Sequence, residues 1–215
     1  PDNRPLVTYV GDSITRMTAA EYGKGYPFRA LELLRVTRPL TENCDTAVGG
    51  YGVSGIVTAG ANTPYYMARQ FYSATRVKNV MVINIGSNDL ANGNPTAFVL
   101  HGTGPPGIAG SGIYPLCDAA RALGYKVVLL TIGPRTDATA IANGFEAARV
   151  IVNNDLAANW AAHADAFVDT RGIVNFGGDA DSNNPLYYSA DLVHPIDAGH
   201  ALIEPVVRAA ILSLL

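Results

Sequence analysis

The residue types that carry out acyl transfer through a serine stand near the two ends of this 215-residue sequence. Ser13 lies in the sequence GDSIT (residues 11–15) directly after an apolar run, where a turn exposes a nucleophile and offers backbone N–H groups to its oxyanion. Asp191 and His194 stand three residues apart, a spacing that lets the carboxylate reach the imidazole and fix its tautomer. The pattern predicts Ser13 as nucleophile, His194 as base and Asp191 as the group that orients the base.

Two further segments offer hydrogen-bond donors for a developing oxyanion. The sequence GVSG (residues 52–55) follows a short apolar run and presents a backbone N–H with no side chain in the way. The sequence GSND (residues 86–89) follows the next apolar run and presents the side-chain amide of Asn88. Each such donor is typically worth about 10²–10³ in rate, so both segments are candidates for the same site.

Taken singly, each segment also has an ordinary structural interpretation. Ser13 can cap a helix, a glycine turn is commonly only a turn, and an aspartate before a histidine is commonly part of a polar surface loop. The first segment also differs from the Gly-x-Ser-x-Gly elbow, because Thr15 stands where the second glycine is needed. A site therefore requires that the fold bring the segments together.

The apolar periodicity predicts the elements that could do so. Continuous apolar strands that alternate with helices indicate a parallel sheet covered on both faces, an α/β three-layer sandwich whose sites lie at the carboxyl ends of the strands. Apolar residues spaced three or four positions apart predict helices over 141–160 and 202–214, and Asp197 is the expected N-cap of the second of these helices. No repeat or linker divides residues 1–215, so we expect one domain. The predicted strands are Leu6–Val10, Thr46–Val48, Val80–Ile85, Val127–Ile132 and Ala166–Val168.

The four segments in this order resemble the SGNH subgroup of the GDSL esterase/lipase family, from about Leu6 to the last helix. The resemblance implies a flavodoxin-like five-stranded parallel sheet and hydrolysis of esters or thioesters without a metal or cofactor. Carried over position by position, it implies Ser13 as nucleophile and backbone donor, Gly55 as a second backbone donor and Asn88 as the side-chain donor. His194 and Asp191 are then the base and its partner.

Aromatic and histidine side chains flank these segments. Tyr187 and Tyr188 precede the Asp-x-x-His sequence, a position that suits tyrosines stacking on a sugar. His101 lies in a stretch rich in Gly and Pro, about residues 92–112, which we expect to be a long loop that is functional or mobile; its residues 98–100 are candidates for lining a modest acyl pocket. We interpret the two tyrosines and His101 as candidate substrate-binding residues, with packing at the loop edges as the alternative.

Composition narrows the class of partner. Apolar residues make up 48% of the chain, which is enough for a sizeable core. Fifteen Lys and Arg against 18 Asp and Glu give a net charge of −3 without a broad basic cluster, which argues against nucleic acid and anionic membranes as partners. No apolar run approaches the ~20 residues of a membrane span. We expect a small, nearly uncharged acylated substrate, for example an acetylated saccharide; the oligomeric state stays open.

Metal ligands, cysteines and the chain start are less informative. Residues 179–190 have the acidic spacing of a calcium loop, but Asn184 and Ala190 replace its glycine and its last glutamate, so we expect no metal. Cys44 and Cys117 lack the spacing of a metal site and are either free thiols or a single disulfide. The chain begins at Pro1 without a leader; the compartment stays open, with a secreted or extracytoplasmic protein as the expectation.

These observations predict a serine ester hydrolase that cleaves short-chain acyl esters through an acyl-enzyme, with carbohydrate O-acetyl esters as the favoured substrate. An arylesterase, an acyl thioesterase and a lysophospholipase of the same family are alternatives that the four segments do not separate. A catalytically silent glycan-binding module is an alternative of a different class. Such a module would be expected to lose its nucleophile or its base, and Ser13 and His194 are both present.

Overall fold

The computed structural model describes residues 4–57, 63–102 and 112–215. In these residues the strands form one five-stranded sheet in which every neighbouring pair is parallel, with the order β2-β1-β3-β4-β5. The predicted α/β fold with a five-stranded parallel sheet is confirmed. The strands are β1 (Leu6–Gly11), β2 (Glu42–Asp45), β3 (Asn79–Asn84), β4 (Lys126–Leu130) and β5 (Ala166–Val168).

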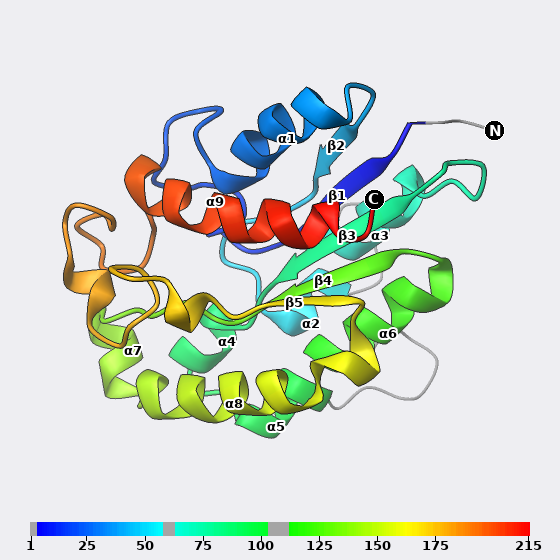
Figure 1. Cartoon of the computed structure of the whole chain (residues 1–215). Helices are drawn as coiled ribbons and strands as arrows, with labels where there is room; N and C mark the ends of the chain where they lie inside the picture. Colours follow the sequence, from blue (N-terminus) through cyan, green and yellow to red (C-terminus); the bar gives the residue numbers. More distant parts are fainter. Residues whose placement is uncertain (1–3, 58–62, 103–111) are drawn as a thin grey trace.

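Helices cover both faces of this sheet (Figure 1). Helices α1 and α9 pack together on one face, and the long helix α8 lies on the other with α5 and α6. The described α-helices are α1 (Tyr26–Thr37), α2 (Val53–Val57), α3 (Pro64–Phe71), α4 (Ser87–Ala91), α5 (Thr96–His101), α6 (Ile113–Leu123), α7 (Ala138–Ala142), α8 (Phe145–His163) and α9 (Asp197–Leu212).

Because successive side chains of a strand point to opposite faces, the sheet has an apolar core on each face. In β3, Val80 and Val82 are buried against α1 and α9, whereas Met81 and Ile83 are buried against the helices of the opposite face. Successive side chains of a strand point to opposite faces, so a strand covered on both sides reads as a continuous apolar run. This is why the strand positions were visible in the sequence.

One predicted strand is displaced. The second strand is Glu42–Asp45, not Thr46–Val48, and it pairs with β1 through the register Leu6↔Glu42. Because β2 is the edge strand and is only half-buried, its sequence ENCD carries no apolar run that could reveal it. Thr46 follows the strand and remains attached to β1, since its backbone N–H and its hydroxyl both donate to the carbonyl of Tyr9.

The predicted long loop is also only partly a loop. Within residues 92–112, residues 96–101 form helix α5, and residues 103–111 lie outside the described part of the chain. Val99 and Leu100 are buried in the core, and Phe98 packs against it. These three apolar side chains therefore stabilise the fold in place of the acyl pocket that we expected them to line.

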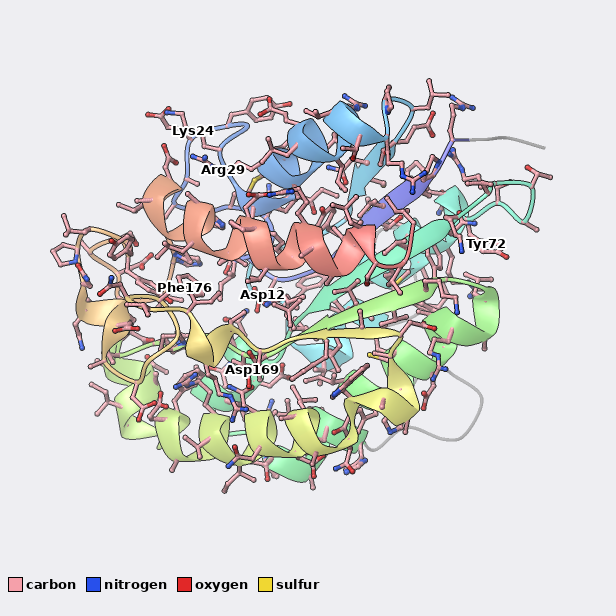
Figure 2. All side chains as sticks on the ribbon, in the orientation of Figure 1. Asp12, Lys24, Arg29, Tyr72, Asp169 and Phe176 are labelled. Carbon is pink, nitrogen blue, oxygen red and sulfur yellow. The ribbon has the colours of Figure 1, made fainter. Side chains whose placement is uncertain are left out.

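The carboxyl ends of β1 and β3 meet at one edge of the sheet, with Gly11 in register with Asn84. The strand order reverses at this point, since the chain places β2 on one side of β1 and β3 on the other. Ligands of open α/β sheets bind in the crevice at such a switch point. Figure 2 shows Asp12, the residue after β1, near the centre of the fold, and Tyr72 at the right edge of the view.

Candidate active site

Ser13 sits in a tight turn that directly follows β1. The carboxylate of the buried Asp12 accepts the N–H of Ile14 at 2.9 Å, and the N–H of Thr18 donates to the carbonyl of Ser13 at 3.1 Å. Met17 adopts a left-handed conformation with φ of 65°, which closes the turn. The turn holds Ser13 at the end of the strand with 8% of its surface exposed.

Asp12 carries a buried carboxyl oxygen, Oδ2, that has no hydrogen-bond partner among the described residues. Burial is the main reason why the pKa of Asp12 rises to about 6, because desolvation penalises the charged form. The positive charges of Arg135 and of a protonated His194 act in the opposite direction, because they favour the anion.

His194 reaches Ser13 from the far end of the chain. Its Nε2 lies 2.7 Å from the Ser13 hydroxyl, and its Nδ1 lies 2.6 Å from a carboxylate oxygen of Asp191. The local turn makes the second contact possible, because Leu192 takes a left-handed conformation with φ of 62° and the backbone doubles back toward Ser189. The structure therefore brings together the three residues that the sequence predicted as nucleophile, base and orienting carboxylate.

Asp191 is held as a carboxylate by the turn around it. Partial burial opposes its ionisation, but its Oδ1 accepts hydrogen bonds from the Ser189 hydroxyl at 2.5 Å and from the backbone N–H groups of Val193 and His194. These bonds and the imidazole contact keep the pKa of Asp191 well below its usual range. Asp191 is thus charged at neutral pH and accepts the Nδ1–H of His194, which leaves Nε2 free to accept a proton from Ser13.

An open cavity of about 700 Å³ lies above Ser13. Asn88 reaches it from the first turn of α4, which begins after Gly86 in a left-handed conformation with φ of 114°. A side chain at residue 86 would also collide with Ile132, so this turn requires glycine. The lining residues are Ser13, Arg16, Thr18, Gly49, Gly50, Asn88 and His194.

The glycine that lies against Ser13 is Gly49, and Gly55 is elsewhere. A Cβ on Gly49 would sit 3.6 Å from the Cβ of Ser13, so Gly49 lies directly beside the side chain of the nucleophile candidate. Gly55 lies inside helix α2, where a Cβ would meet the ring of Tyr51, and it is not among the described residues that line the cavity. The structure does not bring Gly55 to Ser13, and the glycine beside Ser13 at the cavity is Gly49.

The last residue of the GSND segment links the two donor segments. The buried carboxylate of Asp89 accepts the N–H of Val53, the first residue of α2, at 2.9 Å. Gly52 permits this contact, since a Cβ at that position would lie 2.4 Å from Asp89 Oδ1. Burial raises the pKa of Asp89, and the hydrogen bond from Val53 opposes that rise. Asp89 therefore fixes the loop that contains Gly49 relative to Asn88.

The predicted substrate-binding residues are not gathered at the cavity. Tyr188 is 2% exposed, donates its hydroxyl to the carbonyl of Phe176 and stacks on the Phe176 ring. Tyr187 is half-buried against the same core. His101 ends helix α5, where its ring contacts Tyr114 in the layer on the other face of the sheet. None of the three is among the described residues that line the Ser13 cavity, so packing explains them.

Sequence reasoning missed two arginines at the site. Arg135 follows β4 and donates to the carbonyl oxygen of the Asn88 amide at 3.4 Å, and Arg16 lines the cavity three residues after Ser13. Arg135 had a usable signal, because it stands after a predicted strand at the carboxyl edge of the sheet, where sites of such folds lie. Arg16 had a weaker one, its place in the turn that carries the nucleophile.

Several residues weighed in the sequence have structural roles. Cys44 and Cys117 are free thiols. In the acidic stretch, Asp179 pairs with Arg149 and Asp181 accepts the N–H of Gly178. Within the described ranges, no group of three or more His, Cys, Asp or Glu side chains is placed to hold a metal ion. No described helix is long and apolar enough to cross a membrane.

Comparison with known proteins identifies the family of this chain and agrees with its fold. The sequence pattern of the GDSL-like lipase/acylhydrolase family matches residues 9–202, and this chain therefore belongs to that family of ester hydrolases. The predicted family is confirmed. No protein with a curated description matches the chain.

Solved structures share the fold at low sequence identity. A lipolytic G-D-S-L family protein from Veillonella parvula is 19% identical with a TM-score of 0.66, covering 98% of this chain and 100% of its own. An SGNH hydrolase homologue from Slackia heliotrinireducens is 21% identical with a TM-score of 0.64, covering 98% and 100%. The esterase EstA from Pseudoalteromonas is 14% identical with a TM-score of 0.59, covering 99% and 98%.

Proposed function

We propose that this protein is a serine ester hydrolase that cleaves short-chain acyl esters, with O-acetyl esters of carbohydrates as its natural substrates. The observation that supports the reaction is the hydrogen-bonded series from Ser13 Oγ to His194 Nε2, at 2.7 Å, and from His194 Nδ1 to Asp191, at 2.6 Å. A serine hydroxyl is a weak nucleophile until a base removes its proton, and this arrangement supplies an oriented base.

The reaction proceeds in two acyl-transfer steps. His194 Nε2 accepts the hydroxyl proton as Ser13 Oγ attacks the ester carbonyl, and Asp191 stabilises the imidazolium. The imidazolium then protonates the leaving alcohol, and the acyl group remains on Ser13. His194 next removes a proton from water, which attacks the acyl-enzyme and releases the carboxylic acid with Ser13 restored.

We infer three hydrogen-bond donors for the oxyanion. The backbone N–H groups of Ser13 and Gly49 have no hydrogen-bond partner among the described residues, and both residues line the cavity. The Asn88 amide nitrogen is the third donor, and it donates to the Tyr51 carbonyl at 3.0 Å with one of its two hydrogens. Donors held in place before the reaction stabilise the oxyanion without reorganisation, which is their main contribution to rate.

The lining of the cavity supports a polar, compact substrate. Its described residues are serine, threonine, arginine, asparagine, histidine and two glycines, and among them there is no aliphatic or aromatic side chain for a long acyl chain to contact. Hydroxyl-bearing substrates are held by such polar groups, whereas long-chain substrates need apolar walls. A short acyl group on a saccharide fits this lining better than a lipid.

The test compares wild type with Ser13→Ala on p-nitrophenyl acetate, butyrate, octanoate and palmitate, with early time points for an acyl-enzyme burst. We expect a burst, acetate-biased turnover and loss of both in Ser13→Ala, followed by acetate release from acetylated saccharides. A preference for octanoate or palmitate would contradict the short-chain assignment. Equal background rates in both proteins would overturn the hydrolase and favour a binding module.

A labelling experiment tests the nucleophile without a substrate. The Pseudoalteromonas esterase EstA is inhibited by monoethylphosphonate. We expect a fluorophosphonate probe to add its phosphonyl group to wild type, with release of fluoride, and mass spectrometry to locate the adduct on Ser13. His194→Ala serves as a control that keeps the hydroxyl but removes the base. An adduct formed equally by wild type and His194→Ala would contradict an activated serine.

A further inference from the structure

Arg16 differs from the other described arginines because it lines the cavity and its guanidinium has no hydrogen-bond or ion-pair partner among the described residues. In the described residues, every arginine except Arg16 and Arg38 donates a side-chain hydrogen bond, forms an ion pair or stacks on an aromatic ring. An exposed guanidinium carries five donors and no acceptor, so it is suited to a carboxylate or phosphate that arrives from outside.

The position of Arg16 is fixed by the turn that presents the nucleophile. Its N–H donates to the carbonyl of Asp12 at 3.0 Å, and the next residue, Met17, is in the left-handed conformation that closes the turn. The side chain of Met17 is in turn packed against Gly25, where a Cβ would overlap its sulfur. The backbone of Arg16 is therefore as well anchored as that of Ser13.

The guanidinium and the nucleophile face the same small space. Arg16 Nη1 and the Cβ of Ser13 lie 4.0 Å and 3.6 Å from the point that a Cβ on residue 49 would occupy, and Gly49 leaves that point empty. Both side chains line the open cavity together with Thr18 and Asn88. A substrate whose ester carbonyl reaches Ser13 thus passes close to the Arg16 charge.

The charged groups around Arg16 leave it available. Asp45 is the described carboxyl on which Arg16 acts electrostatically, but the two form no ion pair. Asp45 is half-buried and already accepts the N–H of Ala47 at 2.9 Å. His194 shares the cavity and is neutral when it acts as base, so Arg16 provides the permanent positive charge among the described residues that line it.

We propose that Arg16 binds an anionic group of the substrate, so that the natural ester carries a carboxylate close to its scissile acyl bond, as an O-acetylated acidic sugar does. This inference rests on the proposed esterase function and makes its substrate class more specific. It also revises the expectation of a nearly uncharged partner, which followed from the net charge of the whole chain. Net charge averages over the surface, whereas recognition depends on the few charges that face the cavity.

The experiment uses two esters that differ only in charge, the acetylated methyl glycoside of glucuronic acid and the corresponding uronamide. We expect wild type to hydrolyse the uronate with a kcat/KM about tenfold higher, the size of one hydrogen-bonded contact to a charged group. Arg16→Gln should abolish this ratio and Arg16→Lys should keep part of it. Arg38→Gln removes the same charge from the end of α1, away from the cavity, and should leave the ratio unchanged.

A second arm compares monoethyl adipate with diethyl adipate, which places the anion on the acyl side. A charge preference that depends on Arg16 in either arm supports the proposal and identifies the side that carries the anion. Ratios near one in both arms of wild type, or a ratio that persists in Arg16→Gln, would overturn it.

Binding separates this inference from the proposed reaction. In Ser13→Ala, calorimetry should show about tenfold tighter binding of the acetylated uronate than of the uronamide, and the added change Arg16→Gln should remove the difference. Equal affinities would overturn the role of Arg16 even if no ester were hydrolysed. Absence of hydrolysis and of phosphonate labelling would instead overturn the esterase function.

Discussion

The guanidinium of Arg135 holds the carbonyl end of the Asn88 side-chain amide, at a distance of 3.4 Å between Nη1 and Oδ1. The other end of the amide donates to the carbonyl of Tyr51 at 3.0 Å. Arg135 is itself held by Asp137 at 2.6 Å and lies over the ring of Phe145. The amide plane of Asn88, which lines the cavity, is thus set from both ends.

Replacing Arg135 should reduce catalysis through Asn88 alone. We expect Arg135→Gln to lower kcat about tenfold with little change in KM, because a freely rotating amide spends less time with its nitrogen toward the oxyanion. The decisive measurement is a double-mutant cycle on p-nitrophenyl acetate. If Arg135 acts through Asn88, Arg135→Gln adds little to Asn88→Ala; a loss that multiplies fully in the double variant would show an independent role.

Asn88→Ala should lower kcat by about 10²–10³, because the hydrogen bond that the Asn88 amide donates to the substrate strengthens as the oxyanion develops. KM should change little, and the circular dichroism spectrum should match wild type. Asn94→Ala is a matched control, since Asn94 lies just after the helix that carries Asn88 and its side chain donates only a long hydrogen bond to Asp89, at 3.5 Å. Near-normal kcat in Asn88→Ala would remove Asn88 from the oxyanion donors.

Two glycines of one segment should respond differently to alanine. In Gly52→Ala the new Cβ would lie 2.4 Å from the buried carboxylate of Asp89, so we expect a loss of about 1–3 kcal/mol in the free energy of unfolding and reduced kcat. In Gly55→Ala the nearest atom is Cγ of the Tyr51 ring at 3.3 Å, and the free energy of unfolding should stay within about 1 kcal/mol of wild type. Urea unfolding and kcat measured on both variants test this. Equal losses of stability and of kcat in the two variants would contradict the conclusion that Gly55 lies outside the site.

The buried His200 should make the fold sensitive to acid. It is fully buried against the ring of Tyr26, neither ring nitrogen has a partner among the described residues, and burial lowers its pKa to about 4. Because its folded pKa is below that of the unfolded chain, about 6.5, stability is fully present above pH 6.5 and falls as the pH is lowered toward 4. The loss from this one group is of order 3 kcal/mol.

His200→Phe keeps an aromatic ring beside Tyr26 but cannot bind a proton. We expect its free energy of unfolding to fall less than that of wild type between pH 7.5 and pH 4.5, measured by urea unfolding at each pH. The same slope in both proteins would show that His200 does not bind a proton on unfolding. The comparison is made on the difference between the two pH values, so it does not depend on whether the variant is more or less stable overall.

Much of this fold and site could be predicted because the signals are local. The buried strands β1, β3 and β4 appear as apolar runs, since each strand is covered on both faces. The Asp191 and His194 pair is contained in one turn, so three-residue spacing was enough to foresee their contact. The start of α9 shows the limit of predictions from local signals. Asp197 is the first residue of this helix and not its N-cap, and its carboxylate instead accepts the N–H of Glu21.

The remaining features depend on which segments the fold packs together. By itself, the sequence determined the chemical groups, their order along the chain and the strand ends that carry them. Tertiary structure alone decided that Gly49 lies against Ser13, that Tyr188 is buried, and that Arg135 reaches Asn88 across 47 positions of sequence. Periodicity reports which face of an element is apolar, whereas these contacts arise from the packing of elements whose separation in sequence leaves no repeating signal.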